Sequence, residues 1–198
     1  MDFILASASI ARKQLLAQAG IEAIAVKSGF DESLVPLNDP VALVNTLARC
    51  KAEQVLPRYP QALVLGCDSV LALGGEIHGK PANREEAIAR WQQMRGQVGQ
   101  LYTGHALFDT ATGKSVIRCG ITGVKFAPIS DQIIEAYVDT GEPMNCAGCF
   151  AIDGQGGLFV ERLEGCHSNV IGLSLPLLHE MLNELGHSIV EFWQHQNP

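Results

Sequence analysis

Carboxylates, cations and hydroxyl groups gather in the turn-forming stretches of this sequence. The charged residues are Arg12, Asp31, Glu32, Lys51, Asp68, Lys80 and Glu142, and the hydroxyl groups interleaved with them belong to Ser7, Ser9 and Ser69. Carboxylate oxygens suit Mg²⁺ and Mn²⁺, and lysine and arginine suit phosphate. Composition alone assigns most of them to a solvated surface, and any phosphate ligand of this acidic chain must meet a local positive patch or a bound cation.

Two shorter patterns suggest other chemistry. A Gly-Lys-Ser run at residues 113–115 ends like a phosphate-binding P-loop, but Phe108 stands where that loop needs a glycine, so we reject it. Cys146 and Cys149 have the spacing of a redox or zinc pair, but no second Cys or His pair follows at zinc-finger spacing. A redox protein that uses these two thiols is an alternative, and it requires a low thiol pKa.

Composition excludes several classes of protein. The 198-residue chain has a formal net charge of -7 and 14 lysine and arginine residues, which leaves no basic surface for nucleic acid. No apolar run approaches the roughly 20 residues of a membrane-spanning helix, and the N-terminus lacks the pattern of a signal peptide. We therefore expect a cytoplasmic protein with reduced thiols and with neither a nucleic-acid nor a membrane partner.

Strands and helices that alternate along the chain must position the charged residues. Strands are predicted at residues 2–5, 22–27, 62–65, 101–108, 115–126 and 158–162, with a small hairpin at 70–77. Helices are predicted to end at Gly20, to begin near Pro40, to run from Asn83 to about Arg95, to begin after Ser130 and to end at Gly186. The glycine-rich residues 141–157 show little regular pattern. No repeat or linker interrupts the chain, which favours a single α/β domain at 1–186 and a C-terminal tail at 187–198.

The candidate residues fall at the ends of these predicted elements. Asp68 follows the strand at 62–65, and we interpret the run Gly66–Ser69 as the end of that strand. Ser7 and Ser9 lie between the first strand and the first helix, where free backbone N–H groups could add hydrogen bonds to phosphate.

A series of short motifs resembles, in order and spacing, the Maf family of nucleotide pyrophosphatases. In the N-terminal half these motifs are Leu5–Ser9 with Arg12, Asp31-Glu32, Leu47–Ala52, Gly66–Val70 and Gly79–Pro81. In the C-terminal half they are Tyr102–Gly104, Tyr137 through Pro143, Ala147-Gly148, Ile152–Gly154 and Val170–Leu173. The match runs from about residue 3 to residue 185, and several colinear motifs are far more specific than one glycine signature.

The resemblance implies both an activity and a fold. The activity is hydrolysis of the bond between the α and β phosphates of modified or pyrimidine nucleoside triphosphates, with Mg²⁺ or Mn²⁺, to a monophosphate and pyrophosphate. The fold is α/β, with a mixed, strongly twisted sheet, flanking helices and two lobes around a central cleft, commonly as a homodimer. Because family members have been linked to arrest of septum formation, a nucleotide-binding regulator of cell division without turnover is the alternative.

The resemblance also assigns roles to individual residues. Asp68, Glu32 and Lys80 are assigned to catalysis, with Asp68 as the proton acceptor, and their retention argues against a regulator without turnover. Glu32 and Asp68 are assigned to the metal, with Glu32 preferred to Asp31. Contacts to the substrate fall on Ser7, Ser9, Arg12, Lys51, Ser69 and Asp153, and the cations among these and Lys80 bind phosphate.

Three departures from the family pattern affect the choice of base. Ala11 stands where the family shows arginine, or tryptophan in the branch that acts on methylated guanine nucleotides. Asp153 stands where the branch that acts on thymidine and uridine triphosphates shows glutamine, and Ser69 replaces a threonine. Because an ionised Asp accepts hydrogen bonds but cannot donate one, we expect this protein to recognise the base differently.

Overall fold

The described residues of the computed structural model, 1–36 and 38–193, contain a mixed sheet of seven strands. The strands are β1 (Asp2–Leu5), β2 (Ala23–Ala25), β3 (Ala62–Leu73), β4 (Glu76–His78), β5 (Val98–Asp109), β6 (Lys114–Phe126) and β7 (Val160–Glu164). Their order is β2-β1-β3-β5-β6-β7, and β4 pairs with β3. β1 is parallel to β2 and β3, whereas β3–β4 and β6–β7 are antiparallel pairs. The predicted mixed α/β sheet is therefore confirmed.

Helices connect these strands. The α-helices are α1 (Ile10–Gln18), α2 (Pro40–Glu53), α3 (Arg84–Met94), α4 (Asp131–Asp139), α5 (His167–Ile171), α6 (Leu175–Leu185) and α7 (Val190–Trp193). The 3-10 helices are η1 (Glu32–Leu34), η2 (Leu56–Arg58), η3 (Glu142–Asn145), η4 (Ala147–Cys149) and η5 (Gln155–Phe159). Asn83 and Ser130 cap α3 and α4 by accepting hydrogen bonds from the backbone N–H groups of Glu86 and Ile133, so both predicted helix starts are confirmed. In the described part of the chain, no helix combines the length and the apolar character needed to cross a membrane.

The chain divides into two compact units, each assembled from separate segments. Unit 1 comprises Met1–Asp68, Thr103–Gly120 and Gly172–Pro198, and unit 2 comprises Ser69–Tyr102 and Ile121–Ile171. The boundaries fall inside β3, β5 and β6, so these long strands contribute residues to both units. The single domain expected at residues 1–186 therefore contains two units.

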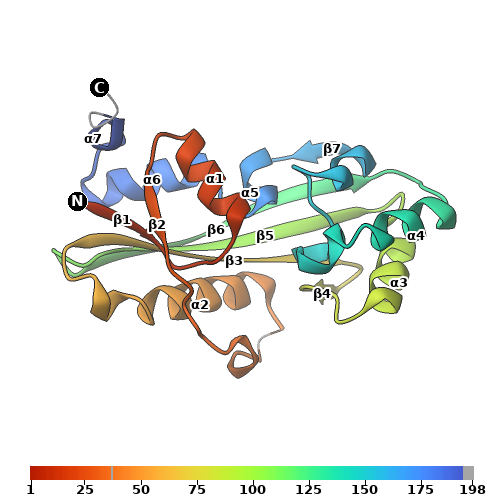
Figure 1. Ribbon diagram of the computed structural model, residues 1–198, viewed down its shortest axis with the longest axis horizontal. Coiled ribbons are helices and arrows are strands. Elements are labelled where there is room, and N and C mark those ends of the chain that lie inside the picture. The colour runs from red at the N-terminus through yellow and green to blue at the C-terminus, as the bar shows by residue number, and fades with distance from the viewer. Residues whose placement is uncertain (37, 194–198) are drawn as a thin grey trace. The chain divides into compact units, whose positions relative to one another are not determined.

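In unit 1, helices cover both faces of the sheet. Figure 1 shows α2 on one face and α1 and α6 on the other. Apolar side chains of β1 and β3, including Ile4 and Val64, form a buried cluster with Ala52 of α2 and with Val55. Burial of such apolar surface contributes roughly 25 cal/mol per Å² and holds α2 against the strands.

Unit 2 is organised around Trp91 of α3. Its ring makes T-shaped contacts with Phe126 of β6, Tyr137 of α4 and Phe159 of η5. Its indole N–H donates a 2.8 Å hydrogen bond to the carbonyl oxygen of Cys149, which satisfies the polar group of a fully buried ring. One side chain of α3 thus contacts four segments that come much later in the sequence.

The described part of the predicted tail packs on unit 1. His187 Nε2 lies 3.2 Å from Asp109 Oδ2, and the ring of Phe192 contacts that of Phe3 edge to face. The indole N–H of Trp193 donates to the carbonyl oxygen of Ala19. The rest of the tail, residues 194–198, lies outside the described residues.

The prediction that Asp68 lies at the end of a strand, in the run Gly66–Ser69, is wrong. β3 continues from Ala62 to Leu73 without a break. The sequence favours a turn because Gly66 and Ser69 are turn-forming residues, but Gly66 serves packing instead, since a Cβ atom there would overlap the carbonyl oxygen of Ala48. The glycine permits a close approach of α2 to the strand.

The glycine-rich stretch is also more regular than its sequence indicates. Residues 141–157, which show little pattern, contain η3 and η4 and the start of η5. The strand predicted at 158–162 begins at Val160, because Leu158 and Phe159 complete η5. Short 3-10 turns lack the apolar periodicity that reveals longer elements.

Candidate active site

Lys51 lies between two carboxylates in unit 1. Its Nζ is 2.6 Å from Asp68 Oδ1 and 2.7 Å from Glu32 Oε1. The side chains of Lys51 and Asp68 are 11% and 10% exposed, whereas that of Glu32 is 58% exposed. Three of the predicted site residues therefore meet in one cluster that is buried on one side and open on the other.

Close packing of α2 on β3 produces this meeting. Gly66 and Asp68 are two positions apart on β3 and point to the same face, and Ala48 and Lys51 are three positions apart on one side of α2. Because the backbone of Gly66 lies against Ala48, the next side chains along the two elements, Asp68 and Lys51, come within hydrogen-bonding distance.

Burial gives the Asp68 carboxyl group a raised pKa. Loss of solvent disfavours its charged form, and the charge of Glu32 adds to the effect, while Lys51 and then Arg12 oppose it. A carboxylate with a raised pKa takes up a proton more readily than an exposed one, which suits a general base.

Arg12 and the two serines form a hydrogen-bonded network in unit 1. The Arg12 guanidinium donates from Nε to Gly172 O (2.7 Å) and from Nη1 to Cys67 O (3.0 Å) and Ser7 Oγ (3.3 Å). Ser9 Oγ accepts from the N–H of Arg12 and caps α1. Arg12 therefore holds the residue next to Asp68 as well as supplying charge.

The expectation of free N–H groups at Ser7 and Ser9 is wrong. The N–H of Ser7 donates to Leu5 O at 2.8 Å, and the N–H of Ser9 donates to Ser7 Oγ at 3.2 Å. Both of these backbone donors are therefore satisfied within the loop and the preceding strand. Ser7 Oγ accepts from the N–H of Ser9, and Ser9 Oγ accepts from the N–H of Arg12, so the O–H of each serine is the group that can donate to a phosphate.

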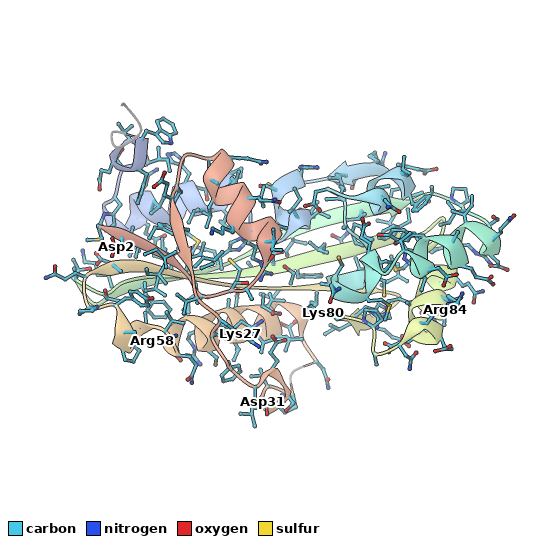
Figure 2. The ribbon with its side chains drawn as sticks, in the orientation of Figure 1. Asp2, Lys27, Asp31, Arg58, Lys80 and Arg84 are labelled. Atoms are coloured by element: carbon cyan, nitrogen blue, oxygen red, sulfur yellow. The ribbon has the colours of Figure 1, made fainter. Side chains whose placement is uncertain are left out.

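Asp31 differs from its neighbour Glu32. Asp31 Oδ1 accepts hydrogen bonds from the backbone N–H (3.0 Å) and the hydroxyl group (2.7 Å) of Ser33, which caps η1 and lowers the pKa of Asp31. Asp31 is labelled on the loop that carries η1 in Figure 2. The Asp31 carboxylate therefore stabilises η1, whereas the Glu32 carboxylate forms an ion pair with Lys51.

The carboxylates of Glu32 and Asp68 fit a divalent cation whose remaining ligands come from the substrate and from water. The described residues contain no group of three or more His, Cys, Asp and Glu side chains that could hold a metal ion. Mg²⁺, however, is commonly bound by only one or two carboxylates together with substrate phosphates and water. Two carboxylates that already converge on one positive charge, the Lys51 ammonium, have the chemistry for that role.

Three predicted site residues belong to unit 2. Lys80, labelled in Figure 2, is exposed and follows β4, and Asp153 is exposed in the loop before η5. Both charges act on the thiol of Cys146: burial, and then the charges of Glu142 and Asp153, raise the pKa of Cys146 to about 11, while the charge of Lys80 opposes this rise. Lys80 and Asp153 therefore lie near the same thiol. Ser69 directly follows Asp68 on β3, and adjacent residues of a strand point to opposite faces.

Comparison of the sequence with known proteins identifies the family of this chain. The family model described as Maf-like protein matches residues 2–185. The chain belongs to the Maf family. A protein named nucleoside triphosphate pyrophosphatase from Microcystis aeruginosa is 61% identical over 193 residues, covering 98% of this chain and 99% of the relative. Proteins of the same name from Gloeothece citriformis and Thermosynechococcus vestitus are 62% and 60% identical, over 98% and 96% of this chain and 99% and 97% of theirs.

Within the Maf family pattern, the structure adds residues that sequence reasoning did not assign. Glu142 and Tyr137 hydrogen-bond to each other and to the backbone of the loop that carries Asp153. Both residues lie in the motif Tyr137 through Pro143, which supports the family resemblance, and membership of that motif is the feature of the sequence that indicates a function for them. His105, an isolated histidine on β5, accepts a hydrogen bond from the N–H of Ser174 and had no such signal.

The chemistry of the thiols contradicts the redox alternative. That alternative requires a low thiol pKa, but burial raises the pKa of both Cys146 and Cys149 to about 11. Thiols with a raised pKa carry little thiolate near neutral pH and are poor nucleophiles. Cys146 Sγ instead donates a hydrogen bond to the carbonyl oxygen of Glu142.

Proposed function

We propose that this member of the Maf family hydrolyses nucleoside triphosphates to a nucleoside monophosphate and pyrophosphate, with a divalent cation. The observation that supports this most is the buried Asp68, whose pKa is raised and which lies 2.6 Å from a lysine that also binds Glu32. The relatives named nucleoside triphosphate pyrophosphatase match this chain over almost its whole length.

In the proposed reaction, Asp68 accepts a proton from the attacking water. The water oxygen forms a bond to the α phosphorus, and the bond between that phosphorus and the bridging oxygen breaks. The electron pair leaves with pyrophosphate, and the other product is the nucleoside monophosphate. Positioned general bases typically contribute about 10²- to 10⁴-fold to a rate.

Charge balance supports a divalent cation. Two negative side chains, Glu32 and Asp68, face two positive ones, Lys51 and Arg12, so these four groups together do not offset the charge of a triphosphate. Glu32 and Asp68 would hold Mg²⁺ or Mn²⁺, which neutralises phosphate oxygens and lowers the pKa of bound water. Lys51 would then be released from the carboxylates to bind phosphate.

The remaining residues are proposed to bind the substrate. Arg12 supplies a fixed positive charge, and the hydroxyl groups of Ser7 and Ser9 donate to phosphate oxygens. From unit 2, we assign phosphate binding to Lys80 and recognition of the base to Asp153, whose carboxylate accepts N–H donors. Ser69 is assigned to the substrate as well.

Pyrophosphate release from a panel of canonical and modified nucleoside triphosphates tests this proposal. We expect release with Mg²⁺ or Mn²⁺, none after addition of a chelator, and a loss of roughly 100-fold or more in Asp68→Asn. The variant keeps the size of the side chain, and its fold is checked by thermal unfolding. Release of single phosphates would reject the assigned bond, and nucleotide binding without turnover would favour a regulator.

A further inference from the structure

The carboxylate of Glu142 binds the backbone of a loop in unit 2. Glu142 Oε1 accepts from the N–H of Gly156 (2.9 Å) and from the hydroxyl group of Tyr137 (2.7 Å), and Oε2 accepts from the N–H of Gln155 (2.9 Å). Partial burial raises the pKa of Glu142, but these hydrogen bonds outweigh it and lower the pKa overall. The group therefore stays ionised and makes charge-assisted bonds, which are about twice as strong as neutral ones.

Tyr137 braces the other end of the same loop. Its hydroxyl group donates to Glu142 and accepts from the N–H of Ala151 at 3.3 Å. Burial, and then the hydrogen bond to Glu142, raise the pKa of Tyr137, so the hydroxyl group stays protonated and can donate. We call these two side chains, Glu142 and Tyr137, the clamp.

Asp153 lies in the turn that the clamp holds. The N–H of Gly154 donates to Ala151 O at 3.3 Å, which makes Ile152 and Asp153 the central residues of a turn. A Cβ atom at Gly154 would overlap the Glu142 carboxylate, and one at Gly156 would overlap the Tyr137 hydroxyl group. The loop therefore fits around the clamp, with Asp153 exposed between its two braced ends.

We propose that Glu142 and Tyr137 are positioning residues that fix the Asp153 carboxylate and thereby set which nucleobase the enzyme prefers, an inference that rests on the proposed function. A fixed acceptor binds a base that has an N–H donor at the matching position. It binds a base with an acceptor there more weakly, because two acceptors cannot pair and both lose a hydrogen bond. A loose turn would let the same carboxylate adapt to several bases and would lose this discrimination.

The surroundings of the turn link it to a residue proposed to bind phosphate. Cys146 follows η3, which begins at Glu142, and its thiol donates to Glu142 O at 3.4 Å. Two residues further on, the N–H of Gly148 donates a 3.1 Å hydrogen bond to the carbonyl oxygen of Gly79, the residue before Lys80. The segment that carries the clamp thus also lies near Lys80, which is assigned to the same substrate.

The test compares Tyr137→Phe and Glu142→Gln with Glu161→Gln, a matched change at an exposed residue of β7. The readout is kcat/KM for ATP, GTP, CTP, UTP and dTTP, with thermal unfolding to verify the fold. We expect the ratio between the best and the worst nucleotide to fall by about ten-fold in both clamp variants and to stay unchanged in Glu161→Gln. Tyr137→Phe removes one hydroxyl group and decides the question if Glu142→Gln does not fold.

A second arm asks whether the clamp acts through Asp153. Asp153→Asn should change the order of preferred nucleotides, and adding Tyr137→Phe to it should leave the ratio unchanged, because the group that the clamp positions is already altered. An equal loss of kcat/KM for all five nucleotides in the clamp variants would overturn the inference and leave the proposed function standing. Absence of pyrophosphate release by the unaltered protein would overturn the proposed function itself, and the inference with it.

Discussion

Adjacent acidic residues in unit 1 have different environments, and this difference can be used to locate the metal. Asp31 caps η1 through Ser33, so its carboxylate is engaged in a local turn. Glu32 instead places Oε1 2.7 Å from Lys51, next to Asp68. If a metal binds at Glu32 and Asp68, its affinity should depend on Glu32 and not on the adjacent Asp31.

Removal of the charge at Glu32 should weaken metal binding. In Glu32→Gln, we expect the Mg²⁺ concentration for half-maximal pyrophosphate release to rise by roughly ten-fold or more, because a neutral amide is a weaker ligand for a hard cation. Asp31→Asn is the control and should shift it by less than about two-fold, since asparagine also caps helices. Metal titrations at saturating nucleotide measure both values. Equal shifts would show that Glu32 is not a ligand.

The types of residue in a sequence indicate the chemistry of a site better than they indicate which groups will form hydrogen bonds with one another. The proximity of Glu32, Lys51 and Asp68 could be expected, because all three lie in motifs shared with one family. The bond from Arg12 Nε to Gly172 O joins residues 160 positions apart, and the sequence does not show which carbonyl group the folded backbone presents. Glu142 illustrates the same limit: a carboxylate in a turn suits a cation as well as backbone N–H groups, and only the fold decides between them.

At the scale of elements, two glycines allow α2 to pack closely on two neighbouring strands. A Cβ atom at Gly66 of β3 would overlap the carbonyl oxygen of Ala48, and one at Gly104 of β5 would overlap that of Val44. Val44 and Ala48 are one helical turn apart, so the helix touches both strands through the same side. Alternation of strands and helices could be predicted from apolar patterns, but this contact could not, because a glycine indicates a turn and a close approach equally well.

Gly66→Ala should disturb both stability and activity. The added methyl group forces α2 away from β3, at a cost of about 1–3 kcal/mol or more, and separates Lys51 from Asp68. Gly123→Ala in β6 is the control: its nearest neighbour would be Glu164 Cβ at 3.5 Å, an ordinary contact, and we expect a change of about 1 kcal/mol or less. Urea unfolding and pyrophosphate release measure the two effects. Similar stability of both variants would mean that the close approach is not required.

At the scale of the whole molecule, stability should depend on pH through His105. This residue is buried on β5, and its Nε2 accepts a 2.9 Å hydrogen bond from the N–H of Ser174, which begins α6. Burial, and then the charge of Arg12, lower the pKa of His105 from 6.5 to about 4. A lone histidine gives no such indication in the sequence, because its pKa is set by segments that come together only in the fold.

The sign of this dependence follows from the lowered pKa. Between pH 6.5 and 4 the unfolded chain binds a proton at His105 that the folded protein does not, so stability is complete above pH 6.5 and falls as the pH falls. At pH 5 the loss should reach about 2 kcal/mol relative to pH 7.5, since each unit of separation is worth about 1.4 kcal/mol. His105→Gln, which has no proton to gain, should be less stable at pH 7.5 but should lose less between the two pH values, as measured by urea unfolding. Parallel pH profiles for the two proteins would place the dependence on other groups.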